Sequence, residues 1–423
     1  MLPELSPDLK IGIIGLGYVG LPLALAFSEK YRVTGYDLDD SRIESLLEGS
    51  DRTKQVSRQE LSASKLKITN KTVDLASCQI YIITVPTPVN EQKKPDLTAL
   101  LLASKTIGAV LKKGDTVIYE STVYPGCTEE DCVPVLEKES GLRYNEDFFC
   151  GYSPERISPG DPVHTLKNII KVTSGSNQAT ADLVDDLYAS IISAGTYKAS
   201  SIKVAEASKA IENAQRDVNI SFVNELALIF DKMEIDTSDV LDAAATKWNF
   251  LNFKPGLVGG HCIGVDPYYL SYKAEQLGYV PRVILSGREV NDQMASFVVN
   301  KCIKLLVSKN VQPIGARALV MGITFKENCP DIRNTKVIDI INELVQFGLE
   351  VDTFDLLAAK EEVLNHYGIT LIDDIYKKNY QVIILAVAHK EFLAIDFGKM
   401  KNPDTILFDT RAVLNREWVD GRL

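Results

Sequence analysis

One cysteine stands in a glycine-rich stretch near the middle of the chain, GGHCIGVD at residues 259–266. Its small neighbours give Cys262 little side-chain cover, so the thiol could face a cleft and act as a nucleophile. Asp266, four residues further on, could act on a water molecule or orient a partner. His261 could be a base or a structural hydrogen-bonding residue. The alternative for the whole stretch is a cysteine packed beneath a loop, because free cysteines are commonly buried.

A lysine and an asparagine, Lys209 and Asn213, stand four residues apart in a segment with helical periodicity. Residues at this spacing share one face of a helix, so the pair could stabilise an oxyanion. The alternative is a solvated helix face. Two further stretches, STVYPG at 121–126 and SPER at 153–156, are predicted loops at strand ends, where open α/β sheets place their ligands.

Three glycines near the N-terminus form the pattern Gly15-x-Gly17-x-x-Gly20 between an apolar strand and an apolar helix. Such glycines permit a sharp turn and let a pyrophosphate approach the helix N-terminus. Asp37 ends the next predicted strand, where a carboxylate accepts hydrogen bonds from ribose hydroxyls. That carboxylate would repel a 2′-phosphate, so the pattern predicts NAD rather than NADP. The alternative is a tight turn without a ligand.

The elements around the glycine pattern follow the order strand, helix, strand. Strands are predicted at 10–15 and 32–37, with a helix at about 20–29 between them. Further strands are expected at 80–85, 116–120 and 169–173. Helical stretches separate these strands, so we predict a parallel sheet covered on both faces to about residue 200.

Residues 202–233 predict one long amphipathic helix, which at mid-chain usually connects domains or forms an oligomer interface. Its apolar positions recur at steps of three and four and include Val204, Ala207, Ile211, Ala214, Val218 and Phe222. A loop at 249–267 follows, and a second α/β pattern begins at about residue 313. Its expected elements are strands at 318–323, 350–355 and 382–387 and a helix at 336–347.

The composition is that of a globular protein without a surplus of cationic residues. The 423 residues, 45% hydrophobic and 24% charged, predict two or three domains. A net charge of −11 argues against nucleic-acid and anionic-membrane partners. No apolar run is long enough for a membrane span, and the N-terminus lacks a secretory pattern. Seven scattered cysteines, with no CxxC pair or Cys/His cluster, predict no metal site and a reduced, cytoplasmic location.

Taken together and in this order, these motifs closely resemble the UDP-glucose/GDP-mannose dehydrogenase family over almost the whole chain. The matching stretches are GLGYVGLP at 15–22, STVYPG, SPER, the Lys209/Asn213 helix, GGHCIGVDP at 259–267 and FKENCPDIRNT at 325–335.

The cysteine loop separates branches of this family. The UDP-glucose enzymes usually carry a GGSCFPKD-like loop, whereas here Val265 replaces the lysine before the aspartate. The stretches GLVGGHCIGVDPYYL, ENAQRDVNISFVNELALIF and TKWNFLNFKPG resemble the branch that oxidises UDP-N-acetylhexosamines, UDP-GlcNAc or UDP-GalNAc, for bacterial surface polysaccharides such as capsule and O-antigen.

The resemblance implies an α/β fold of two Rossmann-like doubly wound domains joined by a long central helix. Residues 1–200 would be the NAD-binding domain and 201–310 a helical dimerisation and catalytic-cysteine region. Residues 311–423 would be the UDP-sugar-binding α/β domain. A homodimer through the central helix is expected.

The reaction that the resemblance implies removes two hydrides from one carbon, with two NAD molecules as acceptors. The C6 alcohol becomes an aldehyde, Cys262 adds to give a thiohemiacetal, and its oxidation gives a thioester that water hydrolyses. Lys209 and Asn213 would stabilise the charge on the C6 oxygen, and Lys209 would favour the thiolate.

Three residues share the remaining catalytic work in this comparison. Thr122 and Asp266 would position water, and Glu155 is a candidate general base for hydrolysis or for the thiohemiacetal step. The division of roles among the three stays open.

The resemblance also implies the binding residues. For NAD they are Gly15, Gly17, Tyr18, Val19, Gly20, Asp37, Arg42, Thr87, Thr122 and Arg333. For the sugar nucleotide they are Glu155, Arg156, Lys209, Asn213, Lys254, Gly259, Lys326 and Arg411.

Three other interpretations remain. The substrate could be UDP-N-acetylmannosamine, UDP-glucose or GDP-mannose. The chain could be a 6-phosphogluconate or 3-hydroxyacid dehydrogenase, which transfers a single hydride and needs no cysteine. It could also be a non-catalytic sugar-nucleotide sensor, against which the retained Cys262, Lys209, Asn213 and Glu155 argue.

Overall fold

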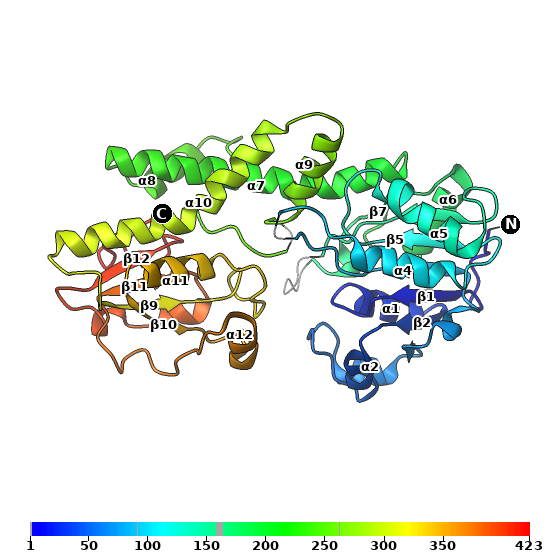
Figure 1. The fold of residues 1–423 in the computed structure, drawn as a ribbon, viewed down its shortest axis with the longest axis horizontal. Coiled ribbons are helices and arrows are strands. Elements are labelled where there is room, and N and C mark those ends of the chain that lie inside the picture. Colours follow the sequence, from blue (N-terminus) through cyan, green and yellow to red (C-terminus); the bar gives the residue numbers. More distant parts are fainter. Residues whose placement is uncertain (1, 91, 158–163, 262) are drawn as a thin grey trace. The chain divides into compact units, whose positions relative to one another are not determined.

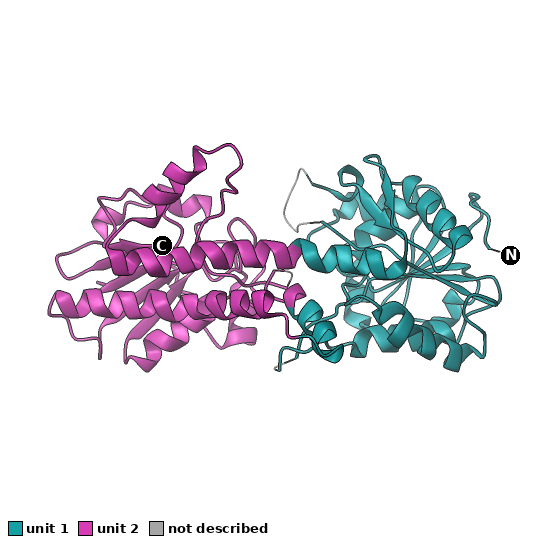
Figure 2. Ribbon diagram, turned by 90° about the horizontal axis from the view of Figure 1, so that it is seen from above, with its two compact units in different colours: residues 1–212, 268–279 teal, residues 213–267, 280–423 magenta. Residues whose placement is uncertain are grey.

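The protein is described here by a computed structural model that covers residues 2–90, 92–157, 164–261 and 263–423. It divides into two compact units, residues 1–212 with 268–279 and residues 213–267 with 280–423 (Figure 2). The division into domains at 1–200, 201–310 and 311–423 stays a prediction beside this two-unit partition.

The first unit is built on a six-stranded parallel sheet in the order β3-β2-β1-β4-β5-β6. The order reverses at β1 and β4, so a crevice for a ligand is expected at the carboxyl ends of these two strands. The strands are β1 (Lys10–Ile14), β2 (Arg32–Tyr36), β3 (Lys67–Thr69), β4 (Ile80–Ile83), β5 (Thr116–Tyr119) and β6 (Phe149–Tyr152).

Both faces of this sheet are covered, as its apolar strands require. Ile82 and Ile118 belong to the core that α1 and α6 close on one face. Tyr119, the next residue of β5, lies on the other face and exchanges a 2.8 Å hydrogen bond with Ser104 of α4. The helices are α1 (Gly20–Ser28), α2 (Asp40–Leu47), α3 (Arg58–Ala63), α4 (Thr98–Gly108), α5 (Val133–Ser140) and α6 (Gln178–Ala189) (Figure 1).

The strand expected at 169–173 is present as β7 (Lys171–Thr173), but it does not extend the six-stranded sheet. It pairs in parallel with β8 (Thr196–Lys198) in a separate two-stranded sheet. The sixth strand of the main sheet is β6, whose sequence FCGY carries a glycine and only three apolar residues.

The long helix predicted at 202–233 is confirmed as α7 (Ile202–Met233). Its polar face, however, is the buried one: Lys209, Asn213 and Asp217 are 8%, 9% and 0% exposed. The solvated-face alternative for Lys209 and Asn213 is therefore wrong. Several apolar positions that revealed the helix, such as Ile211 and Phe222, are more than half exposed, at 54% and 56%.

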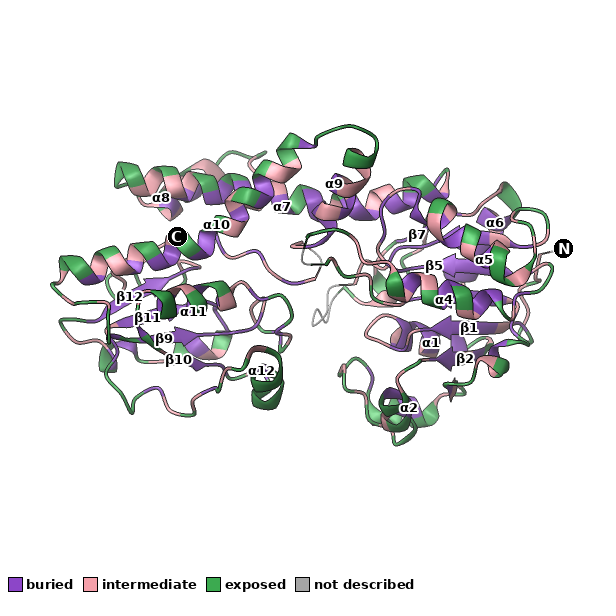
Figure 3. Cartoon of the chain, viewed as in Figure 1, coloured by how far each residue is buried: buried purple, intermediate pink, exposed green. Residues whose placement is uncertain are grey.

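The second unit contains a five-stranded parallel sheet in the order β10-β9-β11-β12-β13. Figure 3 shows the strands of this sheet, like those of the first, as largely buried. The strands are β9 (Arg317–Met321), β10 (Glu350–Phe354), β11 (Val382–Leu385), β12 (Ile406–Asp409) and β13 (Gly421–Arg422). The helices that lie wholly in this unit are α8 (Thr237–Ala245), α10 (Arg282–Ser308), α11 (Val337–Gln346) and α12 (Lys360–Tyr367), while α9 (Asp266–Gln276) begins in it.

The turn after β9 repeats the geometry of the turn after β1. Gly322 has φ +89° and its N–H donates to Phe354, as Gly15, with φ +94°, donates to Tyr36. Asp355 accepts the next N–H of the turn at 2.7 Å, as Asp37 does at 2.8 Å. The two ends of the chain thus use one architecture twice, and the predicted α/β fold is confirmed.

The second copy of this turn has lost the acceptor that a dinucleotide would use. Nδ1 of buried His389 accepts the Asn328 N–H at 2.9 Å, so Nε2 carries the proton and donates to Asp355 at 3.2 Å. Asp355 also accepts backbone N–H groups of Leu357 and Ala358. Asp355 is only 5% exposed, so its carboxylate cannot accept hydrogen bonds from ribose hydroxyls in the way expected of Asp37.

None of the helices described is both long and apolar enough to cross a membrane.

Candidate active site

The three glycines of the first turn answer to different constraints. A Cβ at Gly20 would meet the Gly15 carbonyl oxygen at 1.9 Å, and one at Gly15 would meet the Thr84 backbone at 3.2 Å. A Cβ at Gly17 would meet nothing within 4 Å. Packing within the protein therefore requires the first and third glycines but not the second, whose open side is where a pyrophosphate would approach. The turn fits the dinucleotide predicted for it.

Asp37 follows β2 and is fixed by this turn. One carboxylate oxygen accepts the Leu16 N–H at 2.8 Å and the other accepts the Asp39 N–H at 3.0 Å. Each oxygen keeps a further lone pair, so the group can still accept from ribose hydroxyls. Tyr18 and Val19, also predicted to bind NAD, are half-buried residues of the turn between Gly17 and Gly20.

Arg42 is buried against the glycine turn that follows β1. Its side chain is 1% exposed, Nε donates to the Leu16 carbonyl at 2.8 Å, and the guanidinium pairs with Asp51 at 2.8 Å. Arg42 thus supports the residue between the first two glycines of the motif. This geometry favours an indirect role for Arg42 in dinucleotide binding over a direct contact.

Thr87 and Thr122 come from neighbouring strand ends, after β4 and β5. The Thr87 hydroxyl donates to the Thr122 carbonyl oxygen at 2.6 Å. The Thr122 side chain is half-buried and follows β5, the neighbour of β4, at which the sheet order reverses. Two predicted residues are thereby brought together.

Glu155, of the SPER stretch, is a largely buried carboxylate held by three donors. Lys171 Nζ donates to it at 2.9 Å, and the N–H groups of Arg156 and Ile157 donate at 2.6 and 2.8 Å. Lys171, 3% exposed, donates equally to Glu120 at 2.9 Å. Burial alone would raise the pKa of Glu155, but the Lys171 ammonium and the backbone N–H groups outweigh it and lower that pKa.

The SPER stretch also lies against α7. Arg156 pairs with Glu212 at 2.7 Å and donates to the Ile170 carbonyl at 3.0 Å. Glu212 follows Lys209 by three residues, so the loop is tied to the helical turn that carries the predicted lysine. Within the first unit, therefore, Glu155, Arg156 and Lys209 belong to one neighbourhood.

Asn213 and Asp266 meet directly in the second unit. Asn213 Nδ2 donates to Asp266 Oδ2 at 2.5 Å, and the two residues are 9% and 2% exposed. Asp266 begins α9, and Asn213 lies on the buried polar face of α7. Two residues 53 positions apart, both predicted to be catalytic, are thus joined by one hydrogen bond.

The glycines before the cysteine are needed for packing. A Cβ at Gly259 would meet the Asn334 carbonyl oxygen at 2.5 Å, and one at Gly260 would meet the Phe325 ring at 2.6 Å. The Gly260 N–H donates to Asn334 at 3.0 Å. Gly259, predicted to contact substrate, is thus required by its neighbours as well. Cys262 lies outside the described residues.

His261 is held by the FKENCPDIRNT stretch. Its Nε2 lies 3.0 Å from Asp331, which Arg333 also contacts at 2.6 Å. Burial, and then the charge of Arg333, lower the pKa of His261 to about 4. The imidazole is therefore neutral at pH 7 and structural. Arg333, predicted to bind NAD, is engaged with Asp331 and His261.

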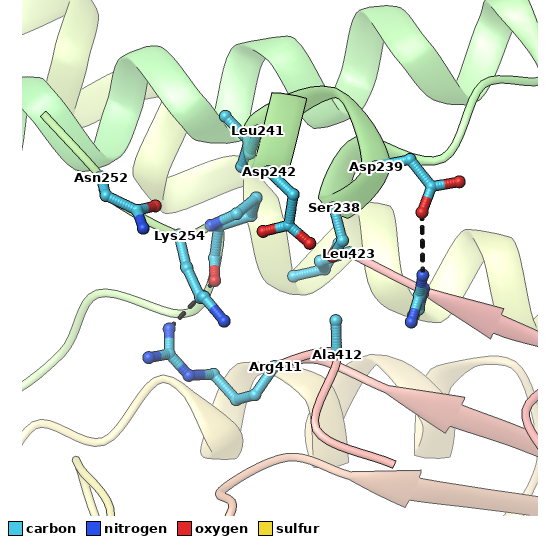
Figure 4. A pocket seen from close by; sticks show the side chains of 11 residues that line it. Ser238, Asp239, Leu241, Asp242, Asn252, Lys254, Arg411, Ala412 and Leu423 are labelled. Carbon is cyan, nitrogen blue, oxygen red and sulfur yellow. Dashed lines mark hydrogen bonds and ion pairs between the residues drawn. The ribbon is translucent and has the colours of Figure 1, made fainter. Parts of the chain in front are cut away.

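Lys254 and Arg411 line a pocket in the second unit between α8 and the end of the chain (Figure 4). Arg411 Nη1 donates to the Pro255 carbonyl at 3.0 Å, and its Nε pairs with Glu327 at 2.7 Å. Asp242, Asn252 and Arg422 also line this pocket. Lys326, also predicted to bind the sugar nucleotide, is half-buried, and its backbone carbonyl accepts a hydrogen bond from the Thr324 hydroxyl.

Sequence reasoning missed several residues that hold these groups. Lys171 and Glu120 are buried charges in or after apolar strands, and the lone lysine in IIKVT was a visible signal of a buried partner. Glu206, Asp217 and Asn224 continue the polar face of α7 beyond Lys209 and Asn213, in a series with steps of three, four, four and seven residues, and all are 0% exposed.

Domain comparisons cover most of the chain. Residues 9–192 match the NAD binding domain of the UDP-glucose/GDP-mannose dehydrogenase family, residues 203–293 its central domain, and residues 319–416 its UDP binding domain.

Individual proteins match over the full length. The chain is 56% identical to the UDP-N-acetyl-D-glucosamine 6-dehydrogenase of Pseudomonas aeruginosa, covering 98% of this chain and 100% of that protein. It is 52% identical to the enzyme of the same name from Salmonella typhi, covering 98% and 99%. Among solved structures, UDP-D-ManNAc dehydrogenase from Pyrococcus horikoshii matches with a TM-score of 0.89 at 29% identity, covering 98% of each chain.

Proposed function

Because the chain belongs to the UDP-glucose/GDP-mannose dehydrogenase family, we propose that it oxidises the C6 hydroxyl of UDP-GlcNAc to a carboxylate with two NAD. The resemblance predicted from the motifs is thereby confirmed, and with it an NAD-binding domain and a UDP-binding domain. UDP-GalNAc is the second candidate substrate, and UDP-ManNAc and UDP-glucose follow.

The observation that carries the substrate proposal is identity over the whole length. Two proteins named UDP-N-acetyl-D-glucosamine 6-dehydrogenases share 56% and 52% of their residues with this chain, whereas the matching UDP-D-ManNAc dehydrogenase shares 29%. The sequence of the GGHC loop resembles the same branch, and its Gly259 and Gly260 pack tightly on the stretch that begins at residue 325. We infer that this packing shapes a pocket for the N-acetylhexosamine.

We assign to Lys209 and Asn213 the stabilisation of the negative charge that develops on the C6 oxygen. The bond from Asn213 Nδ2 to Asp266 fixes the amide, whose remaining donor and acceptor can face substrate. Asp266 then acts by orienting Asn213 and a water molecule. NAD, when bound on the glycine turn, would supply the acceptor for both hydrides, and Cys262 the nucleophile between them.

Glu155 is better suited to orientation than to proton transfer. A general base works best when its pKa lies near the working pH, whereas Lys171 lowers the pKa of Glu155. We therefore assign Glu155 the role of a fixed acceptor for a substrate hydroxyl or for the hydrolytic water. Thr122, whose carbonyl is held by Thr87, positions that water.

We propose a homodimer that forms through α7. Apolar side chains on this helix are exposed at positions 7 and 4 residues apart: Phe222 at 56%, Ile229 at 44% and Met233 at 57%. Such spacing places them on one face, opposite the buried polar stripe. A contiguous apolar stripe of this kind marks an interaction surface. A cytoplasmic location and a role in surface polysaccharide synthesis stay predictions.

The test is a comparison of four substrates. Initial rates of NADH formation with UDP-GlcNAc, UDP-GalNAc, UDP-ManNAc and UDP-glucose give kcat/KM for each. The proposal predicts the highest value for UDP-GlcNAc. A higher value for another sugar would reassign the substrate within the family, and binding of all four without NADH would favour a non-catalytic sensor.

A further inference from the structure

Asn224 is a buried amide of α7 that bonds to a loop instead of to its own helix. Its Nδ2 donates to the Gly256 carbonyl at 3.1 Å, and its Oδ1 accepts the Gly256 N–H at 2.8 Å. Asn224 is 0% exposed. Two bonds from one rigid amide to one residue fix both the position and the orientation of that backbone, as a neighbouring strand would.

The Asn224 amide is itself held from behind. Its Nδ2 also donates to Asn291 of α10 at 2.8 Å, and Asn291 donates to Asp217 at 2.8 Å. Arg288 completes the chain with a bond of 2.6 Å to the same carboxylate oxygen. All four residues are at most 3% exposed. Reversing the Asn224 amide would set its NH2 group against the Gly256 N–H and its oxygen against the Gly256 carbonyl, so the amide has one orientation.

The Pro255–Gly256 backbone that Asn224 fixes also contacts the Arg411 guanidinium. A Cβ at Gly256 would meet Arg411 Nη1 at 2.6 Å, and this nitrogen donates to the Pro255 carbonyl at 3.0 Å. Lys254 precedes this residue pair and lines the same pocket as Arg411. A shift of Gly256 would therefore move two of the cations that line the pocket, Lys254 and Arg411.

We propose that Asn224 is a positioning residue for nucleotide binding: it holds the Pro255–Gly256 backbone so that Lys254 and Arg411 converge on the diphosphate of the sugar nucleotide. The inference rests on the proposed function, because it takes UDP as the ligand of this pocket. Two cations serve one diphosphate only when their separation is fixed, and displacements near 1 Å weaken such sites. Asn224 touches neither the substrate nor NAD in this account.

The test uses Asn224→Asp and Asn224→Leu in the full-length protein, with Ser221→Ala as the matched control. Aspartate keeps the acceptor for the Gly256 N–H but loses the donor to its carbonyl. Ser221 lies one turn earlier on the same buried face, and its hydroxyl donates within the helix, to the Val218 carbonyl. Calorimetry measures UDP binding and, separately, NADH binding, and thermal unfolding measures stability.

The proposal predicts that both Asn224 variants weaken UDP binding about tenfold or more. NADH binding, which belongs to the glycine turn of the first unit, should stay within about twofold of the parent. Ser221→Ala should change neither affinity. A merely structural role would lower the unfolding temperature while the folded protein bound UDP as before, and that result would overturn the inference.

A variant at Gly256 tests the same inference if the Asn224 variants do not fold. Gly256→Ala leaves the Asn224 amide intact and pushes on Arg411 directly, so it should also weaken UDP binding about tenfold. Unchanged UDP affinity in this variant would contradict the inference while leaving the proposed function in place. A parent protein that bound no UDP would overturn the proposed function itself, and the inference with it.

Discussion

Replacing Glu206 by glutamine should remove a pH dependence from the stability of the first unit. Glu206 is 0% exposed in the first turns of α7, and its two carboxylate oxygens accept the N–H groups of Gly126 and Thr128 at 2.5 and 2.9 Å. Burial raises the pKa of Glu206 to about 7; these N–H groups oppose the rise, and nearby Glu129 adds to it. The group holds the stretch that begins with STVYPG.

The sign and size follow from the two pKa values of Glu206. In the unfolded chain the carboxyl group titrates near 4.5, whereas in the folded protein it keeps its proton to about pH 7. Between these values the folded state binds the additional proton, so its contribution to stability is present below pH 4.5 and is lost as the pH rises through 7. The pKa difference corresponds to about 3 kcal/mol in all.

Glutamine cannot titrate, so the difference in stability between variant and parent isolates this group. At pH 5 the variant should be less stable by about 1–3 kcal/mol, because its carboxamide offers one acceptor to two N–H donors. By pH 8 the difference should have moved in favour of the variant by about 3 kcal/mol, or roughly 6–12 °C in unfolding temperature for a unit of this size. Thermal unfolding at pH 5, 6, 7 and 8 gives this curve. A difference that stays constant across the range would refute the reasoning.

Three further perturbations have expected outcomes. Lys171→Met leaves two buried carboxylates without their cation, so it should lower the free energy of unfolding by about 3–5 kcal/mol. It should also move the acid limb of the pH–rate profile to higher pH, because the pKa of Glu155 rises. An unchanged profile in a folded variant would contradict this role of Lys171. Gly17→Ala should unfold at the parent temperature but raise the KM for NAD, whereas Gly20→Ala should fail to fold, because only the latter Cβ meets protein atoms; equal stability losses in the two would contradict this account. If the proposed dimer forms through α7, Phe222→Glu should lower the mass measured by light scattering to that of a monomer, and an unaltered dimer mass would place the interface elsewhere.

The first βαβ unit was predictable because its signals are local. An apolar strand, a glycine turn and a carboxylate at the end of the next strand lie within residues 10–37, and each follows from backbone geometry. The long α7 was predictable for the same reason, since periodicity over 32 residues outweighs single exceptions.

Which face of α7 is buried could not be predicted from that periodicity. Hydrophobic patterning assumes that apolar residues point inward, but here Asp217 and Asn224 are buried, and partners distant in sequence hydrogen-bond to both. Those partners, Arg288 and Asn291, lie on α10, whose 27 residues were not identified as a helix. Buried polar positions within α10 interrupt the apolar repeat that would have revealed it.

The pairing of site residues was also beyond the sequence. Motif resemblance places Asn213 and Asp266 in one site, but only the fold shows that a hydrogen bond joins their side chains. The partners of Lys171, in contrast, are indicated by the sequence, because burying a lysine between apolar residues of a strand costs free energy unless a carboxylate pairs with it. Glu120 and Glu155 are those carboxylates.

The central claim is a four-electron oxidation through Cys262, and the NADH yield tests it most directly. With limiting UDP-GlcNAc and excess NAD, the parent protein should release two NADH per sugar nucleotide, and Cys262→Ser should not complete the turnover. A yield of one NADH per substrate, or a serine variant that still released two, would contradict the account.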